Sequence, residues 1–245
     1  YCFGEERHPM TAADCAFFLT AENGLPVQDE KGSFVLDEEA VTAYVQSLAE
    51  EYDGYGRTRQ FHSTRGDVIT IDGGTYGSKM DRKKETAYLL EHLLDPGVHT
   101  GTPQSHIPSY EREAFCYGKN DIGDTYIEVD MTEQKMYYYE KGVLKLETEI
   151  VTGNMRRRMG TPEGVNFVYN KQKNRVLRGP GYASPVKFWM PVKGGIGIHD
   201  AGWRKEFGGD IYQTAGSHGC INTPKDKMEE LFDCVQIGTP VVMFY

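Results

Sequence analysis

The second half of the chain is built from short segments in which apolar and polar side chains alternate, separated by tight turns. Residues 125–130 alternate in this way, residues 135–139 follow after a short turn, and residues 143–151 follow Glu140-Lys141-Gly142. Alternation with a period of two is the pattern of a strand with one face on a core, and such short connections join antiparallel neighbours. This half is therefore predicted to be a mainly-β domain that begins with an antiparallel meander. Further strands are predicted at residues 165–170, 186–192, 196–198 and 241–245.

The first half combines helical and strand patterns. Apolar residues recur every three to four positions over residues 40–49, behind Asp37-Glu38-Glu39, and predict a helix whose acidic first turn suits the helix dipole. A second helix is predicted over residues 81–94, ended by Asp95-Pro96-Gly97. Two short strands, at residues 61–64 and 67–71, and an irregular connector at residues 98–120 complete this half. We predict an α+β domain over residues 1–120 and a mainly-β domain over residues 121–245.

One helix in the second half is clearly marked. Thr223 is its predicted N-cap and Pro224 its first position, with Asp226 in the first turn. Its apolar face is predicted to consist of Met228, Leu231, Phe232 and Val235. We expect Cys234 to be buried on the same side as a small hydrophobic residue.

The charge of the chain excludes some classes of partner. The net charge is −9, and all of it lies in residues 1–120, because acidic and basic residues balance in residues 121–245. Nucleic-acid binding needs a basic surface, which this distribution does not supply. The one basic run, Arg156-Arg157-Arg158, is interpreted as a solvated loop. No apolar run approaches the roughly 20 residues of a membrane helix, so we expect any membrane anchor to lie in a segment absent from this chain.

The cysteines do not form a recognisable framework. There are five, Cys2, Cys15, Cys116, Cys220 and Cys234, without any C-x-x-C spacing, so neither a disulfide scaffold nor a zinc ribbon is indicated. Cys2 and Cys15 could pair, and the sequence does not decide whether they do.

The segment Ser217-His218-Gly219-Cys220-Ile221-Asn222 carries the chemistry. It joins a glycine-containing loop to the predicted helix, where exposed sulfur and nearby backbone N–H groups would favour a reactive thiolate. Gly219 permits close approach of the backbone, so N–H groups at 219–220 could stabilise an oxyanion. A thiol nucleophile needs a base, and both His218 and His199 qualify. The glycine-rich residues 200–216 between them are predicted to form a mobile flap.

Two other interpretations of this segment are open. A His-Gly-Cys sequence can be a turn with a buried thiol that has no chemical role. His199, His218 and Cys220 could instead be three ligands of a catalytic zinc ion.

The same residues resemble a known family. His199, seventeen intervening residues and then Ser217-His218-Gly219-Cys220-Ile221-Asn222 are similar to the signature of the L,D-transpeptidases with a YkuD-type catalytic domain. Three further segments resemble the same family: Tyr126-Ile127-Glu128-Val129, Val151-Thr152-Gly153 and the stretch 161–167. This resemblance covers residues 122–245. A looser one, over residues 38–117, is to the peptidoglycan-binding domain often fused ahead of it.

The resemblance implies a β-sandwich-like fold with one short helix after the nucleophile, and an enzyme of peptidoglycan cross-linking. Cys220 would attack the carbonyl of the third residue of a tetrapeptide stem, release D-Ala and pass the thioester to an amine of a second stem, giving a 3→3 cross-link. No cofactor or metal is expected. Carbapenems are expected inhibitors, and the expected location is extracytoplasmic, at the wall of a Gram-positive bacterium.

The resemblance also assigns roles to individual residues. His199 would be the base, oriented by the backbone carbonyl of Asp200, and His218 would shape the site. Gly219 and Cys220 would supply oxyanion N–H groups, while Ser217 and Asn222 would brace the loop. Three aromatic residues could line the stem-peptide groove or could pack in the core: Tyr182, Trp189 and Trp203.

Two rival functions remain open at this level. A hydrolase, acting as an L,D-carboxypeptidase or endopeptidase, would pass the same thioester to water. A wall-binding module would carry the same residues without using them.

Overall fold

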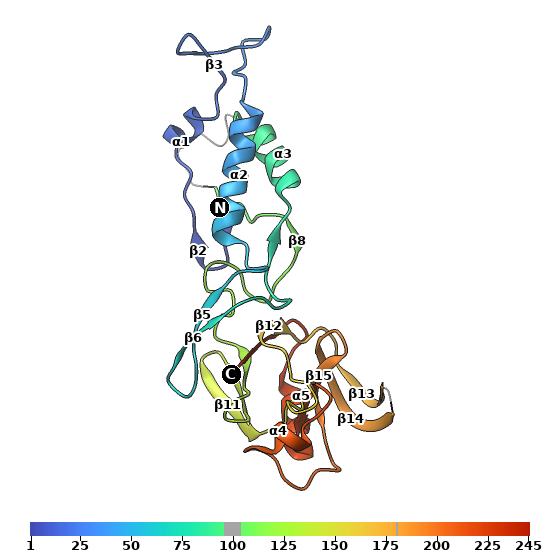
Figure 1. The fold of residues 1–245 in the computed structure, drawn as a ribbon. Coiled ribbons are helices and arrows are strands. Elements are labelled where there is room, and N and C mark those ends of the chain that lie inside the picture. The colour runs from blue at the N-terminus through green and yellow to red at the C-terminus, as the bar shows by residue number, and fades with distance from the viewer. Residues whose placement is uncertain (96–103, 180) are drawn as a thin grey trace. The chain divides into compact units, whose positions relative to one another are not determined.

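The computed structural model describes residues 1–95, 104–179 and 181–245 (Figure 1). The chain packs into two compact units. Unit 1 consists of Tyr1–Tyr55 and Gly77–Asp121, and unit 2 consists of Gly56–Tyr76 and Ile122–Tyr245. The chain thus leaves unit 1 after residue 55, contributes residues 56–76 to unit 2 and returns to unit 1 at residue 77. From residue 122 to the end it belongs to unit 2.

Unit 1 is built around two helices that pack against each other, α2 (Glu38–Tyr52) and α3 (Arg82–His92) (Figure 1). Both helices were predicted, and each begins where an aspartate caps it. The side chain of Asp37 accepts hydrogen bonds from the N–H groups of Glu39 and Ala40, and the side chain of Asp81 accepts one from Lys84 N–H. These caps satisfy N–H groups that have no partner within the helix.

The core of unit 1 lies along the apolar face of α2, where Val41, Val45 and Leu48 are buried against α3 and the N-terminal segment. The connector predicted at residues 98–120 contains a strand, so that expectation was partly wrong; residues 98–103 lie outside the described residues. The remaining elements are β1 (Cys2–Phe3), β2 (Glu6–Arg7), α1 (Ala12–Ala16), β3 (Ala21–Glu22), β4 (Leu25–Pro26), β7 (Lys79–Met80) and β8 (Tyr110–Arg112).

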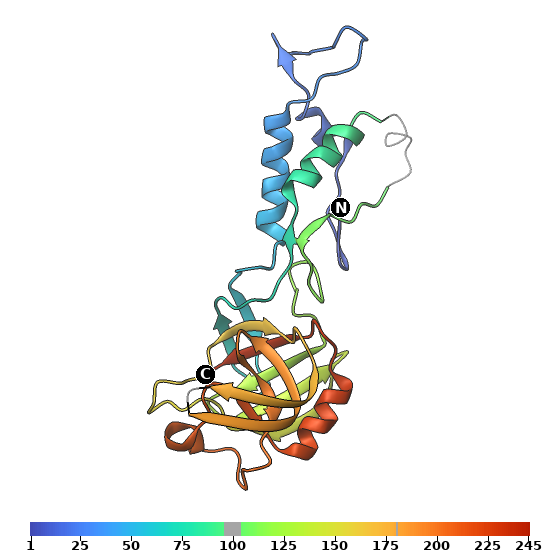
Figure 2. The same cartoon turned by 90° about the vertical axis from the view of Figure 1, so that its right-hand side faces the viewer.

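Unit 2 is a β-sandwich of two sheets that share one core (Figure 2). The five-stranded sheet has the order β11-β10-β9-β17-β12, and the four-stranded sheet has the order β13-β14-β15-β16. The strands of the first sheet are β9 (Tyr126–Asp130), β10 (Lys135–Glu140), β11 (Val143–Glu149), β12 (Gly164–Phe167) and β17 (Pro240–Phe244). Those of the second are β13 (Gln172–Gly179), β14 (Tyr182–Lys193), β15 (Ile196–Asp200) and β16 (Ile221–Thr223).

The predicted meander is confirmed, because β9, β10 and β11 pair antiparallel in chain order. Alternation places Ile127 and Val129 of β9 in the shared core, where they meet Met190 of β14 and Ile198 of β15. Two strands were not predicted. In β13 most residues are polar and exposed, so the strand has no apolar face to reveal it, and β16 is only three residues long.

The helix α5 (Lys225–Cys234) packs on β14, β15 and β11. Its predicted apolar face is confirmed, since Met228, Leu231, Phe232 and Val235 are all buried. Two details of the prediction were wrong. Pro224 is the N-cap, because Thr223 belongs to β16, and Cys234 is exposed because it lies about 100° from the centre of the apolar stripe. A short helix, α4 (Ile211–Ala215), was not predicted.

The segment Gly56–Tyr76 was assigned to the first domain from the sequence, but it packs with unit 2. Its hairpin consists of β5 (Arg59–His62) and β6 (Val68–Ile71), both predicted. At the turn, Thr64 Oγ1 donates to the buried carboxylate of Glu128 at 2.6 Å, and Arg65 forms an ion pair with the buried Asp130 at 3.1 Å. Two carboxylates buried in β9 thus find their partners on a distant segment, which a linear division of the chain does not anticipate.

No helix among the residues described is both long and apolar enough to cross a bilayer. Cys2 and Cys15, for which pairing was left open, are both free thiols.

The hairpin should stabilise unit 2 through Glu128. Burial raises the pKa of Glu128, and its bonds with Thr64 oppose that effect. Thr64→Val removes the hydroxyl donor to a buried carboxylate, so we expect the free energy of unfolding of unit 2 to fall by about 1–3 kcal/mol. Urea unfolding followed by tryptophan fluorescence measures this, because both tryptophans, Trp189 and Trp203, lie in unit 2.

The matched control is Thr70→Val on the same hairpin. Thr70 Oγ1 bonds only the exposed Gln60 among the contacts given for its side chain, so its replacement should change stability by less than about 0.5 kcal/mol. Equal effects of the two substitutions would contradict a specific role for the Thr64–Glu128 contact.

Candidate active site

Cys220 lies at the end of a loop and directly before β16. This strand pairs in parallel with β15, and the register places His199 opposite Asn222 and Ile198 opposite Ile221. His199 and Cys220 are 21 positions apart in the sequence, yet the strand pairing puts them in neighbouring positions on one sheet. Both residues line the same cavity, of about 190 Å³.

The loop before Cys220 is held by hydrogen bonds from its own serine and from a distant threonine. Ser217 Oγ donates to the carbonyl of Cys220 at 2.6 Å and accepts the N–H of Gly219 at 3.0 Å. Thr161 Oγ1 donates to the carbonyl of Gly219 at 2.7 Å and accepts the N–H of Gly153 at 3.0 Å. Gly219 has φ +112°, a conformation that L side chains rarely adopt, so glycine is required at this position.

The same loop is also paired with the backbone of residues 151–154. The N–H of Ser217 donates to Thr152 O, and the N–H of Asn154 donates to Ser217 O, each at 2.9 Å. Asn222 and Val151 exchange both backbone hydrogen bonds, also at 2.9 Å. The segment before the sulfur and the segment after it are therefore both tied to the core, which fixes the backbone of Cys220 between them.

The ring of His199 is held from several sides. Its Nδ1 lies 2.9 Å from the carbonyl oxygen of Asp200, and because a carbonyl only accepts, Nδ1 carries the proton and Nε2 is left as the acceptor. The ring packs between Trp189 and Trp203, with centroids 5.9 and 5.8 Å away. His199 is only 4% exposed, and this burial lowers its pKa. The imidazole is thus held in its neutral form, with a defined tautomer.

The sulfur of Cys220 is half-buried, and burial raises the pKa of the thiol, although the N–H of Gly197 opposes that shift. Its Sγ lies 3.8 Å from the carbonyl oxygen of Gly195. The expectation that the start of a helix would favour the thiolate was wrong, because β16 separates Cys220 from α5. The resting pair is a neutral thiol beside a neutral imidazole, so the base must remove the proton during the reaction.

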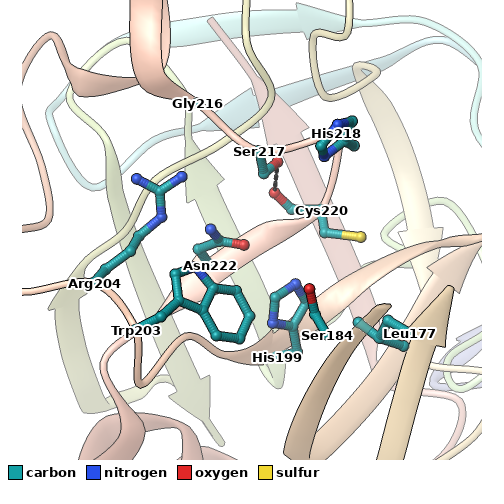
Figure 3. Close-up of a pocket in the computed structure, with 10 residues that line it drawn as sticks. All are labelled: Leu177, Ser184, His199, Trp203, Arg204, Gly216, Ser217, His218, Cys220 and Asn222. Carbon is teal, nitrogen blue, oxygen red and sulfur yellow. Dashed lines mark hydrogen bonds between the residues drawn. The ribbon is translucent and has the colours of Figure 1, made fainter. Parts of the chain in front are cut away.

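The two candidate histidines differ in their surroundings. Figure 3 shows the ring of His199 on one side of the Cys220 sulfur and the ring of His218 on the other. His218 is exposed, whereas His199 is buried and oriented by Asp200. The geometry therefore favours His199 as the base.

The remaining predicted site residues brace this arrangement. Asp200 contributes its side chain as well as its carbonyl, since Oδ1 accepts the N–H groups of Lys187 and Phe188 of β14 at 2.8 Å each. Asn222 is buried and lines the cavity. The N–H groups of Gly219 and Cys220 were both expected to donate to an oxyanion. The N–H of Gly219 instead donates to Ser217 Oγ, so only the N–H of Cys220 remains as a candidate donor from this pair.

The three aromatic residues expected in a substrate groove have different positions. Trp203 lines the cavity and is 52% exposed. Trp189 is buried in contact with His199 and lines a second cavity, which Cys220 also lines. Tyr182 begins β14, and its side chain lies outside the described residues.

Sequence reasoning missed part of the cavity wall. The hairpin of β13 and β14 contributes Leu177 and Ser184, and the segment 200–216 contributes Arg204 beside Trp203 (Figure 3). A turn signal, Gly179-Pro180-Gly181, stands in the sequence between these two strands and could have indicated the hairpin. Arg204 had no signal in the sequence, because only the folded loop brings it to the cavity.

A zinc site was the other interpretation of these residues. Within residues 1–95, 104–179 and 181–245, no three His, Cys, Asp or Glu side chains lie close enough to hold a metal ion. His199, His218 and Cys220 therefore do not form such a group in this structure.

Known family models match both halves of the chain. Residues 124–243 match the YkuD family, described as the L,D-transpeptidase catalytic domain. Residues 21–97 match a family described as "Putative peptidoglycan binding domain". A comparison with curated protein sequences gave no match.

Solved structures match nearly the whole chain. The crystal structure of the C442S mutant of Enterococcus faecium L,D-transpeptidase is 36% identical and covers 99% of this chain and 93% of that one, with a TM-score of 0.83. The Ldtfm–avibactam carbamoyl enzyme is 37% identical over 99% of this chain and 91% of that one, with a TM-score of 0.84. On the strength of these two matches and of the cysteine loop with its buried histidine, the chain belongs to the L,D-transpeptidase family.

Proposed function

We propose that this protein forms 3→3 cross-links in peptidoglycan through a thioester on Cys220. The donor is a tetrapeptide stem, and the bond cleaved joins its third residue to the terminal D-Ala. The observation that carries the proposal is the cavity lined by both Cys220 and a buried histidine, His199, whose tautomer leaves Nε2 as the acceptor. That combination is what a thiol nucleophile with a general base requires.

The first half of the reaction follows from the protonation states. Nε2 of His199 accepts the proton of the thiol as Sγ forms a bond to the carbonyl carbon of the third residue. The N–H of Cys220 stabilises the oxygen as it becomes negative. When the C–N bond breaks, the imidazolium returns the proton to the departing amine of D-Ala, and a thioester remains on Cys220.

The second half transfers the acyl group to an amine of another stem. His199 accepts a proton from that amine as its nitrogen attacks the thioester. When the C–S bond breaks, the imidazolium returns that proton to Sγ, which regenerates the thiol and the neutral imidazole. Space for a second peptide is available, because Cys220 also lines a cavity of about 380 Å³ together with Trp189, Gly194 and Gly195. Cys220 thus lines two cavities, which supports transfer between two peptides over simple hydrolysis.

The family matches support a place of action at the cell wall. A catalytic domain for peptidoglycan stems and a peptidoglycan-binding domain in one chain indicate an extracytoplasmic protein. The oriented His199 and the braced loop argue against a wall-binding module with idle catalytic residues. A Gram-positive source remains a prediction.

Inhibition is proposed by analogy with a relative. One relative, Ldtfm, forms a carbamoyl enzyme with avibactam. We expect carbapenems to acylate Cys220 of this chain by the same addition to a carbonyl.

Replacing the nucleophile tests the proposal directly. Cys220→Ala should abolish dimer formation from a disaccharide tetrapeptide, a loss of about a thousandfold or more, and should also abolish the carbapenem adduct. Mass spectrometry of products and of intact protein measures both. Cys234→Ala, at an exposed thiol on α5, is the matched control and should retain both activities. Release of D-Ala by the native protein without any dimer would instead identify a carboxypeptidase.

Replacement of each of the two histidines should slow the reaction to a different extent. His199→Gln removes the proposed base and should lower kcat by about 10²–10⁴-fold. His218→Gln should lower kcat by about tenfold or less, because the ring of His218 is exposed and is not assigned the proton transfer. Initial rates of dimer formation in the two variants decide between them. A larger loss for His218→Gln would reverse the assignment.

The pH dependence follows from the shifted pKa values. His199 must be neutral to accept a proton, and its pKa is lowered, so the acid limb of kcat/KM should lie below about pH 6.5. The pKa of Cys220 is raised, so its alkylation by iodoacetamide should rise with a midpoint above about pH 8.5. Alkylation that is already complete and independent of pH between about 5 and 8 would indicate a resting thiolate and contradict this mechanism.

A further inference from the structure

Arg204 is a cation in the wall of the catalytic cavity that the reaction described above does not use. It stands in the segment 200–216, next to Trp203, and lines the cavity together with Cys220 and His199 (Figure 3). Apart from the two histidines and the thiol, Arg204 is the only titratable residue among the described residues of the lining. These residues therefore give the cavity a fixed positive charge and no negative one.

The hydrogen bonds of Arg204 are incomplete. Its Nη2 donates to the carbonyl oxygen of Ala215 at 2.9 Å, but its Nε is buried without a hydrogen-bond partner. Among the described residues no carboxylate forms an ion pair with it; the ion pairs of unit 2 involve other cations, such as Arg65 and Lys135. Burial even lowers the pKa of this guanidinium, which marks the loss of water around it.

A half-buried cation without a counter-ion is costly unless a ligand supplies one. Guanidinium groups present their donors in a planar fork that matches a carboxylate. A second role, support of the loop through Ala215, accounts for the hydrogen bond of Nη2 but not for the charge of the guanidinium. The combination of a cavity and a cation without a counter-ion among the described residues indicates an anionic ligand.

We propose that Arg204 binds a carboxylate of the stem peptide and so selects donors that carry a free acid. This inference rests on the proposed function, because it takes the cavity to be the donor site. The stem offers two such groups, the terminal carboxylate of D-Ala beside the bond to be cleaved and the α-carboxylate of the second residue. Both have the chemistry that the guanidinium recognises, and amidation removes either one.

The test measures binding without turnover. In a Cys220→Ala background, the dissociation constants of three tetrapeptides are compared by isothermal titration calorimetry: the free acid, its C-terminal amide and the form amidated at the second residue. One amide should bind about 10- to 100-fold more weakly than the free acid, and which of the two loses affinity identifies the carboxylate.

Three substitutions complete the design. Arg204→Gln should lower the affinity for the free acid about 10- to 100-fold and leave the affinity for the affected amide unchanged. Arg204→Lys keeps the positive charge without the planar fork, so it should lower the affinity for the free acid by an intermediate factor. Arg156→Gln, at an exposed arginine outside the cavity, should change nothing. If Arg204 only supports the loop, its replacement will lower the affinities for the acid and the amide by the same factor, and that result would overturn the inference.

The same peptides keep this inference separate from the proposed function. If the native protein forms no dimer and releases no D-Ala from any of them, the proposed function fails while the ratio of binding constants still reports on Arg204. If the native protein is active and Arg204→Gln leaves the acid-to-amide ratio unchanged, only the inference on Arg204 fails.

Discussion

The parallel pairing of β15 with β16 brings His199 and Cys220 together, and the remaining features of the site serve to hold that pairing in place. Residues 151–154 bind the loop before the sulfur and the strand after it. Thr161 and Ser217 fix the turn between them. Cys220 thus lies on backbone that is hydrogen-bonded on both sides, which restricts its movement within the cavity that it shares with His199. Such fixed geometry is what a reaction between bound groups requires.

Burial of this pair has a chemical consequence. Removing water disfavours charge on both partners, which lowers the pKa of His199 and raises that of Cys220. Each shift opposes a resting thiolate–imidazolium pair. In the proposed mechanism the thiol is therefore neutral at rest, and its proton is transferred to Nε2 as the sulfur attacks the carbonyl. Arg204 is the one permanent charge in the same cavity, and its effect on His199 is to disfavour the imidazolium further.

Much of the architecture was accessible from local patterns. The alternation in residues 125–151 predicted the meander, and the spacing of Met228, Leu231, Phe232 and Val235 predicted the buried face of α5. The failures have physical causes. The polar, exposed strand β13 has no apolar alternation to detect, and β16 is too short to show a period. The hairpin of residues 56–76 packs with unit 2 because Glu128 and Asp130 need partners there. These partners are more than 60 positions away in the sequence, so no local sequence pattern predicts the contacts.

The sequence by itself singled out Cys220 as the candidate nucleophile, the glycine beside it and the two histidines that could serve as its base. It could not choose between those histidines, because His199 and His218 carry the same side chain and differ only in what surrounds them. Tertiary structure favours His199, because it buries that ring in contact with two tryptophans and gives its Nδ1 a carbonyl partner. It also raises the pKa of the thiol and brings Arg204 to the cavity wall. These properties depend on burial and on contacts between distant segments, which only the folded chain creates.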